Sequence, residues 1–244
     1  MKKMILSAAL VLASTAAMAQ SGTFQLKANL KNMGDTIIVY KGRGEKRDTI
    51  LVKKDKFTYS ATLTQPKEMM FAQPAIFRGG RAEAFYLVCV PGETAEVVGD
   101  LKAKFDIKGS NFYKQFAEVD AMKDEADKEL ADFEKSINEK MKNGGDREAL
   151  MKEYEEKAPA LTKAKEEKML AFIGQHPDYE ASATLIGEMS SCENMQKAVD
   201  MLSAQVKNGR MKAFYEPIVE RAKKQAEMEE KAKVVQASGV EAPD

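Results

Sequence analysis

The chain has 244 residues, of which 44% are hydrophobic, and it carries 38 basic and 38 acidic side chains. This hydrophobic content is enough for a real core in one large domain or two small ones. Because neither sign of charge dominates, the composition indicates no polyanionic partner, and we expect no nucleic-acid binding. Most charged residues follow Asn111, which separates an apolar first half from a solvated second half.

Residues 1–19 have the pattern of an export signal. A basic start precedes an apolar core at residues 5–13, and residues 17–19 have the small-x-small cleavage pattern Ala-Met-Ala. We therefore predict cleavage between Ala19 and Gln20 and a location in the periplasm or cell envelope. The apolar core is too short to span a bilayer, so no stable membrane span is expected after signal removal.

Residues 23–109 have the short hydrophobic period of β structure. Apolar residues alternate over residues 23–30 and 57–63, as expected of half-buried strands. Shorter strands are predicted at residues 36–40, 49–52, 69–72, 75–77, 85–90, 94–98 and 105–107. This pattern of roughly eight strands favours an antiparallel β-sandwich or barrel-like unit over a βαβ fold.

Residues 85–110 connect the two halves of the chain. The opening run, FYLVCV, is rich in aromatic and β-branched side chains, which predicts a strand buried on both faces or at a sheet centre. Pro91 and Gly92 favour a turn directly after this run. Ser110 is a candidate N-cap, and the hydrophobic period changes there from 2 to 3.6 residues.

Two long helices are predicted after Ser110. Apolar residues recur at spacings of three and four over residues 112–141 and again over residues 150–173. Residues 143–145 break the pattern, and Asp146 is a candidate N-cap for the returning arm. We expect a long antiparallel helix hairpin, kinked at Pro159, that packs on the β unit at one end only.

The remaining residues are predicted to form shorter helices and a charged final helix. A short apolar helix is expected over residues 178–190, and residues 190–193 fit a capping box for a helix that continues to Asn208. A last helix begins within residues 211–218 and is dense in lysine and glutamate over residues 221–233. The fold class is therefore α+β.

No catalytic constellation is present, and we predict no catalytic, cofactor-binding or metal-binding residues and no cofactor. Cys89 and Cys192 are far apart in sequence and form no C-x-x-C pair, which favours two buried, unpaired thiols over a disulfide. Cys192 lies in a predicted first helical turn, where it is either a reactive thiol or a small buried side chain. His176 is the only histidine and has no companion ligands for a metal.

Several short motifs together resemble a known module. They read FYLVxVPGE at residues 85–93, VxGD at 97–100, FIGQHPD at 172–178 and GVEAPD at 239–244. This layout resembles the N-terminal domain of unknown function that precedes thioredoxin-like modules of the alkyl hydroperoxide reductase and thiol-specific antioxidant superfamily in Bacteroidetes envelope proteins. The resemblance implies a β-rich domain at residues 20–110, a helical region at 111–235 and a linker at 236–244.

The resemblance implies a scaffold rather than a chemistry, because the paired cysteines of the family would lie beyond Asp244. The first hypothesis is a non-catalytic exported module, the docking half of a thiol-disulfide oxidoreductase architecture. Its partner would be an envelope protein or a separate thioredoxin-like protein. One alternative is the front part of a thioredoxin-like oxidoreductase or peroxiredoxin. A second is a periplasmic chaperone-like protein that binds clients through the hairpin.

Overall fold

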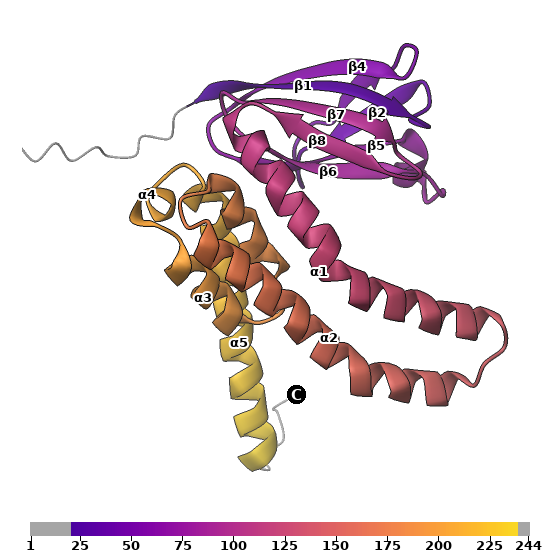
Figure 1. Ribbon diagram of the computed structural model, residues 1–244, viewed down its shortest axis with the longest axis vertical. Helices are drawn as coiled ribbons and strands as arrows, with labels where there is room; N and C mark the ends of the chain where they lie inside the picture. The colour runs from indigo at the N-terminus through magenta and orange to yellow at the C-terminus, as the bar shows by residue number, and fades with distance from the viewer. Residues whose placement is uncertain (1–20, 239–244) are drawn as a thin grey trace, which may run out of the picture.

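A computed structural model describes residues 21–238 and has the predicted α+β class, with a β unit followed by helices (Figure 1). The predicted signal and its cleavage site at Ala19 and Gln20 lie outside the described residues, as do residues 239–244 of the predicted linker.

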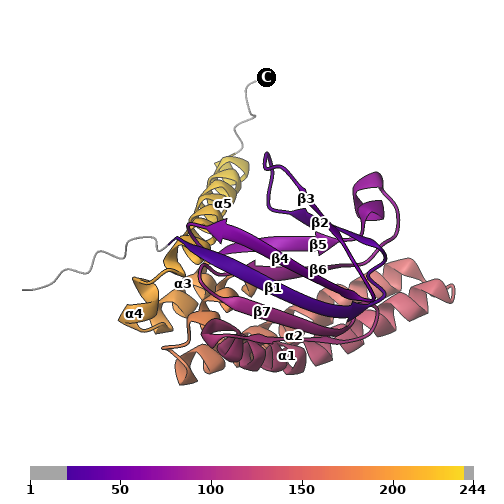
Figure 2. The ribbon, with the colours of Figure 1, turned by 90° about the horizontal axis from the view of Figure 1, so that it is seen from above.

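The β unit consists of two four-stranded sheets. Its strands are β1 (Gly22–Lys31), β2 (Thr36–Tyr40), β3 (Asp48–Leu51), β4 (Lys56–Leu63), β5 (Lys67–Ala72), β6 (Ala84–Cys89), β7 (Thr94–Asp100) and β8 (Phe105–Gly109). One sheet has the order β4-β1-β7-β8 and the other β3-β2-β5-β6. Every ladder is antiparallel except that of β1 with β7, which is parallel. Figure 2 shows the two sheets from above.

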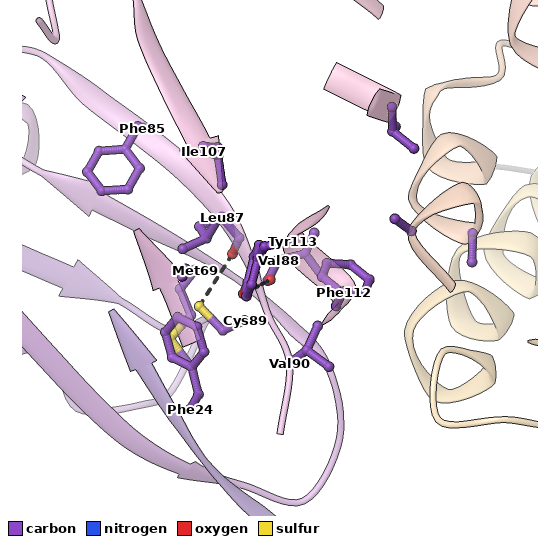
Figure 3. Packing of buried hydrophobic residues seen from close by; sticks show 14 of the residues in the cluster. Phe24, Met69, Phe85, Leu87, Val88, Cys89, Val90, Ile107, Phe112 and Tyr113 are labelled. Carbon is purple, nitrogen blue, oxygen red and sulfur yellow. Dashed lines mark hydrogen bonds between the residues drawn. The ribbon is translucent and has the colours of Figure 1, made fainter. Parts of the chain in front are cut away.

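The core of the β unit lies between the two sheets. On β1, Phe24 and Leu26 are fully buried, whereas Gln25 between them is exposed, so the predicted alternation is confirmed. From the opposite sheet, Phe71 and Phe85 stack with their ring centroids 5.0 Å apart. Figure 3 shows Phe24 and Phe85 within this cluster. The apolar faces of both sheets are therefore buried against each other.

Strand β6 differs from the sequence prediction of a strand buried on both faces. It is the edge strand of its sheet, and its third residue, Tyr86, is 60% exposed. The sequence pattern counts Tyr86 as apolar, but tyrosine can present its polar hydroxyl to water while its ring packs on a surface. The exposed face of the strand was therefore not visible in the pattern. The strand itself is confirmed, but one of its edges has no neighbouring strand.

A second difference concerns residues 75–77, which were predicted as a strand. They belong to a 3₁₀ helix, η1 (Pro74–Arg78). Pro74 occupies the first helical position, where its fixed φ suits a helix and its missing N–H is not needed. Gly79 ends η1 with a φ of 74°, a left-handed conformation that glycine adopts without strain.

The helical region follows Ser110. It contains α1 (Asn111–Lys142), α2 (Arg147–Gln175), the 3₁₀ helix η2 (Glu180–Glu188), α3 (Cys192–Met201), α4 (Ala204–Lys207) and α5 (Lys212–Ser238). The hairpin of α1 and α2 has the predicted break, and Asp146 caps α2 by accepting a hydrogen bond from the Glu148 backbone N–H at 2.9 Å. Pro159 lies inside α2, which continues past it as one helix.

The hairpin packs near its open end, where α1 contacts β8 and η2. Farther along, Ala126 and Ile137 on α1 and Leu150 and Ala158 on α2 are buried. Figure 1 shows that the tip of the hairpin lies away from the β unit. The distal half of the hairpin therefore buries its apolar stripe chiefly between its own two arms.

The predicted helix over residues 190–208 is divided in the structure. The N-cap of α3 is Ser191, whose hydroxyl accepts from the Asn194 backbone N–H at 3.1 Å, rather than Ser190. The helix ends at Met201, because Ser203 adopts an extended conformation and caps the separate helix α4. A serine that can bond to the backbone ahead of it favours a new helix start over continuation.

Candidate functional site

The β unit and the helices are joined by a polar cluster around Arg210, between α4 and α5. Its guanidinium donates to Glu180 in η2, with Nε to Oε1 at 3.0 Å, and to Glu93 after β6, with Nη2 to Oε1 at 2.6 Å. Its Nη1 donates to the backbone carbonyl oxygen of Pro91 at 3.0 Å. We call Arg210, Glu93 and Glu180 the Arg210 joint, because they connect three distant segments.

The Arg210 joint also holds the start of α1. The Ser110 hydroxyl and the Phe112 backbone N–H both donate to Oε2 of Glu93, which is only 7% exposed. Burial acts to raise the pKa of Glu93, but the hydrogen bonds from Ser110 and Arg210 outweigh it and hold that pKa below the ordinary value. Because both oxygens of Glu93 are hydrogen-bonded, this cluster is structural.

A cleft of about 640 Å³ lies where β6 and β8 face α1. Its volume is within the range of about 300–1,000 Å³ that is typical of ligand pockets. We call it the β6–α1 cleft. Its aromatic side chains come from β6, β8, α1 and α5 and are Tyr86, Phe105, Phe116 and Phe214. Its charged side chains are Glu68, Lys104, Asp120, Lys123, Asp124 and Glu188.

Strand register and helix period bring these side chains together. Glu68 on β5 pairs with Val88 on β6, two residues from Tyr86, so Glu68 and Tyr86 project from the same face of the sheet. On α1, Asp120 and Asp124 are about one turn apart and share a face of the helix. The cleft therefore combines the outer face of one sheet with one face of α1.

Both lysines of the β6–α1 cleft are already in ion pairs. Lys104 contacts Asp124, with Nζ to Oδ2 at 3.2 Å, and Lys123 contacts Glu188 in η2. These pairs link the β7–β8 loop to α1, and α1 to η2. The cleft thus has two compensated carboxylates, each held by a lysine.

The other two carboxylates of the cleft, Glu68 and Asp120, form no ion pair within residues 21–238. Partial burial raises the pKa of Glu68, and the nearby charge of Glu188 raises it further. Burial likewise raises the pKa of Asp120, with a further contribution from Asp124. The charges of Lys123 near both groups and of Lys104 near Asp120 act in the opposite direction without outweighing burial, so both pKa values are raised.

The sequence-predicted candidate thiol, Cys192, is the first residue of α3 and is half-buried and unpaired. Cys89 is buried and also unpaired, so both thiols are free as predicted, although only that of Cys89 is buried. Burial raises the pKa of Cys89, so its thiol stays protonated and unreactive. The structure does not bring either cysteine into the β6–α1 cleft.

His176 lies at the end of α2 between two aromatic rings. Its ring centroid is 4.5 Å from that of Phe172 and 4.6 Å from that of Tyr179, which fits the predicted role at a helix junction. Among the described residues, no three or more histidine, cysteine, aspartate or glutamate side chains are grouped so as to hold a metal ion. Within the same residues, no helix combines the length and the apolar character that a bilayer crossing requires.

The residues of the Arg210 joint and of the β6–α1 cleft carry no motif that marks them in the sequence. Arg210 and Glu93 are 117 positions apart, so no local pattern connects them. The placement of Asp120 four residues after Phe116, beside the apolar stripe of α1, was the one available signal of a partly buried carboxylate.

Comparisons with protein-family models, with curated proteins and with solved structures found no match to this chain.

Proposed function

We propose that this chain is a non-catalytic docking module of the cell envelope, and that a partner protein inserts a lysine- or arginine-bearing segment into the β6–α1 cleft. The observation that carries the proposal is the composition of the cleft. Four carboxylates face only two lysines, and both lysines are already paired with carboxylates. A basic segment would supply the missing positive charge.

The walls of the cleft support binding of a polypeptide rather than of a free ion. Tyr86, Phe105, Phe116 and Phe214 provide aromatic surface on which the aliphatic stem of a lysine or arginine can pack. The hydroxyl of Thr184 is already used, because it donates to the backbone carbonyl oxygen of Ala181 at 2.7 Å. Aromatic walls with a few fixed charges are typical of recognition sites.

The location in the envelope and the link to thiol-disulfide oxidoreductases are part of this proposal and rest on the sequence patterns described above. The genomic sequence after the Asp244 codon tests the alternative that the chain is the front part of such an enzyme. The chaperone-like alternative gains no support from the hairpin. Ile137 and Leu150, which belong to its apolar stripe, are buried and so are not available to a client.

Fluorescence anisotropy with a defined probe tests the proposal. The probe is a labelled, end-capped octapeptide of alternating valine and lysine, compared with one of alternating valine and glutamate at about 50 mM salt. We expect binding of the lysine peptide only. The substitution Asp120→Lys should weaken it about tenfold, because it places a cation where the ligand's cation would bind.

The matched control is Asp132→Lys, which makes the same charge change on an exposed part of α1 outside the cleft. It should change the affinity by less than about twofold. Equal losses in the two variants would mean that the peptide responds only to net charge. Absence of binding to the unmodified protein would contradict the proposed function directly.

A further inference from the structure

Two hydrogen bonds establish which way the backbone groups of β6 point. The Gln73 N–H donates to the Glu83 carbonyl at 3.0 Å and continues the β5–β6 ladder by one pair. In an antiparallel strand, the N–H and C=O of one residue point to the same side, and successive residues alternate. Odd-numbered residues of β6 therefore face β5, and Ala84, Tyr86 and Val88 face away from it.

The second hydrogen bond confirms this assignment independently. The Tyr113 hydroxyl, on α1, donates to the Val88 carbonyl oxygen at 2.7 Å, so this carbonyl points away from β5 (Figure 3). Tyr113 is fully buried, and it covers the outer edge of β6 at Val88. Toward the other end of β6, Ala84 is half-buried and Tyr86 is exposed. The uncovered part of the edge thus runs from Ala84 to Tyr86.

The corresponding edge of the other sheet is covered. Its edge strand is β8, and α1 packs against β8 directly. The outer edge of β6, by contrast, opens on the cleft that Tyr86 and Val88 line. An uncovered strand edge presents N–H and C=O groups that a second extended chain can pair with.

We propose that the basic segment of the partner binds by strand addition, as an extended strand that pairs with β6 at Tyr86 and lies between β6 and α1. This inference rests on the proposed function and specifies how the same cleft is occupied. The Tyr86 N–H and C=O bond to one residue of the segment, and the cover of Val88 by Tyr113 limits the length of the pairing.

The same geometry specifies the sequence of the partner. Side chains of an added strand alternate between the two faces of the sheet. One face is that of Glu68 and Tyr86, where a lysine or arginine approaches a carboxylate that forms no ion pair within residues 21–238. The other face points toward Phe105 and Ile107 of β8, where apolar side chains fit. The segment therefore alternates basic and apolar residues.

Substitutions at Tyr86 test the strand pairing on the protein side. Tyr86→Pro removes the outward N–H without removing a bond of the β5–β6 ladder, and proline is tolerated on such an edge. Tyr86→Ala is its matched control, because it also removes the phenol ring but keeps the N–H. We expect the proline variant to bind the valine–lysine octapeptide about tenfold more weakly than the alanine variant, since the paired carbonyl loses its donor.

N-methylation of the peptide tests the pairing without altering the protein, and so remains informative if Tyr86→Pro fails to fold. Methylating together all amides of every second residue should weaken binding for only one of the two alternating sets, because only every second amide faces β6. Uniform tolerance of N-methylation, together with a retained loss in Asp120→Lys, would overturn strand addition while leaving the proposed function intact. Failure of the unmodified peptide to bind would overturn both.

Discussion

The Arg210 joint and the β6–α1 cleft both place carboxylates between the β unit and the helices, but the pKa values of these carboxylates shift in opposite directions. At the joint, Arg210 and Ser110 hydrogen-bond Glu93, and these bonds lower its pKa. In the cleft, Glu68 and Asp120 have no cation within hydrogen-bonding distance in the described part of the chain, and burial raises their pKa. The same chemical group is therefore hydrogen-bonded and ion-paired at one site and, among the described residues, accessible without an ion pair at the other.

This difference indicates that the Arg210 joint stabilises the fold and that the β6–α1 cleft is available to bind a ligand. A buried carboxylate with a full set of donors stabilises the fold only while its partners remain. A carboxylate without a cation costs stability, and proteins retain such costs at sites of function. Substitutions that change one partner at each site test this difference.

Removing the cation of the joint should have the largest effect on stability. Arg210→Met leaves Glu93 buried without its cation, and we expect the free energy of unfolding to fall by about 3 kcal/mol. Urea denaturation measures this change. The control Arg221→Met, on the exposed surface of α5, should change it by less than about 0.5 kcal/mol. Equal effects of the two substitutions would remove the structural role assigned to the joint.

The pH dependence of this stabilisation follows from the lowered pKa of Glu93. A carboxylate whose folded pKa lies below its unfolded value stabilises the fold above the unfolded value, here near 4.5. The contribution is lost as pH falls through the folded pKa. Arg210→Met should therefore reduce the stability difference between pH 7 and pH 3, which acid unfolding followed by circular dichroism will measure.

Neutralising a cleft carboxylate should have a smaller effect of opposite sign. The raised pKa of Asp120 means that its charged form is disfavoured in the folded state at neutral pH. Asp120→Asn should therefore increase the free energy of unfolding by about 0.5 kcal/mol. It should also weaken binding of the valine–lysine octapeptide. Asp132→Asn, outside the cleft, should change neither. Destabilisation by Asp120→Asn would show that Asp120 has a partner within the fold.

The contrast between the two sites also explains how far the sequence predicts the structure. Strand alternation on β1 and the cap at Asp146 are local signals, and the structure confirms both. The α+β class follows from the change of hydrophobic period at Ser110. These features depend on residues close together in the chain, so pattern and propensity are sufficient to place them.

The features that were missed depend on contacts between distant segments. The apolar run at residues 85–90 predicts a strand, but whether that strand is central or at an edge depends on which strands pair beside it. Arg210 is one of many basic residues in the helical region until the fold brings Glu93 next to it. The candidate thiol Cys192 met its local prediction of a helix start, yet lies outside the cleft.

Side-chain carboxyl titration by NMR, without and with the valine–lysine octapeptide, compares the carboxylates of the Arg210 joint and of the β6–α1 cleft in one experiment. In the free protein, Glu93 should titrate below its ordinary pKa, and Glu68 and Asp120 should titrate above theirs. The peptide should lower the pKa values of Glu68 and Asp120 and leave that of Glu93 unchanged, because a cation favours the charged form only of groups that it approaches. Ordinary or lowered pKa values for Glu68 and Asp120 in the free protein, or no response to the peptide, would contradict the role proposed for the β6–α1 cleft.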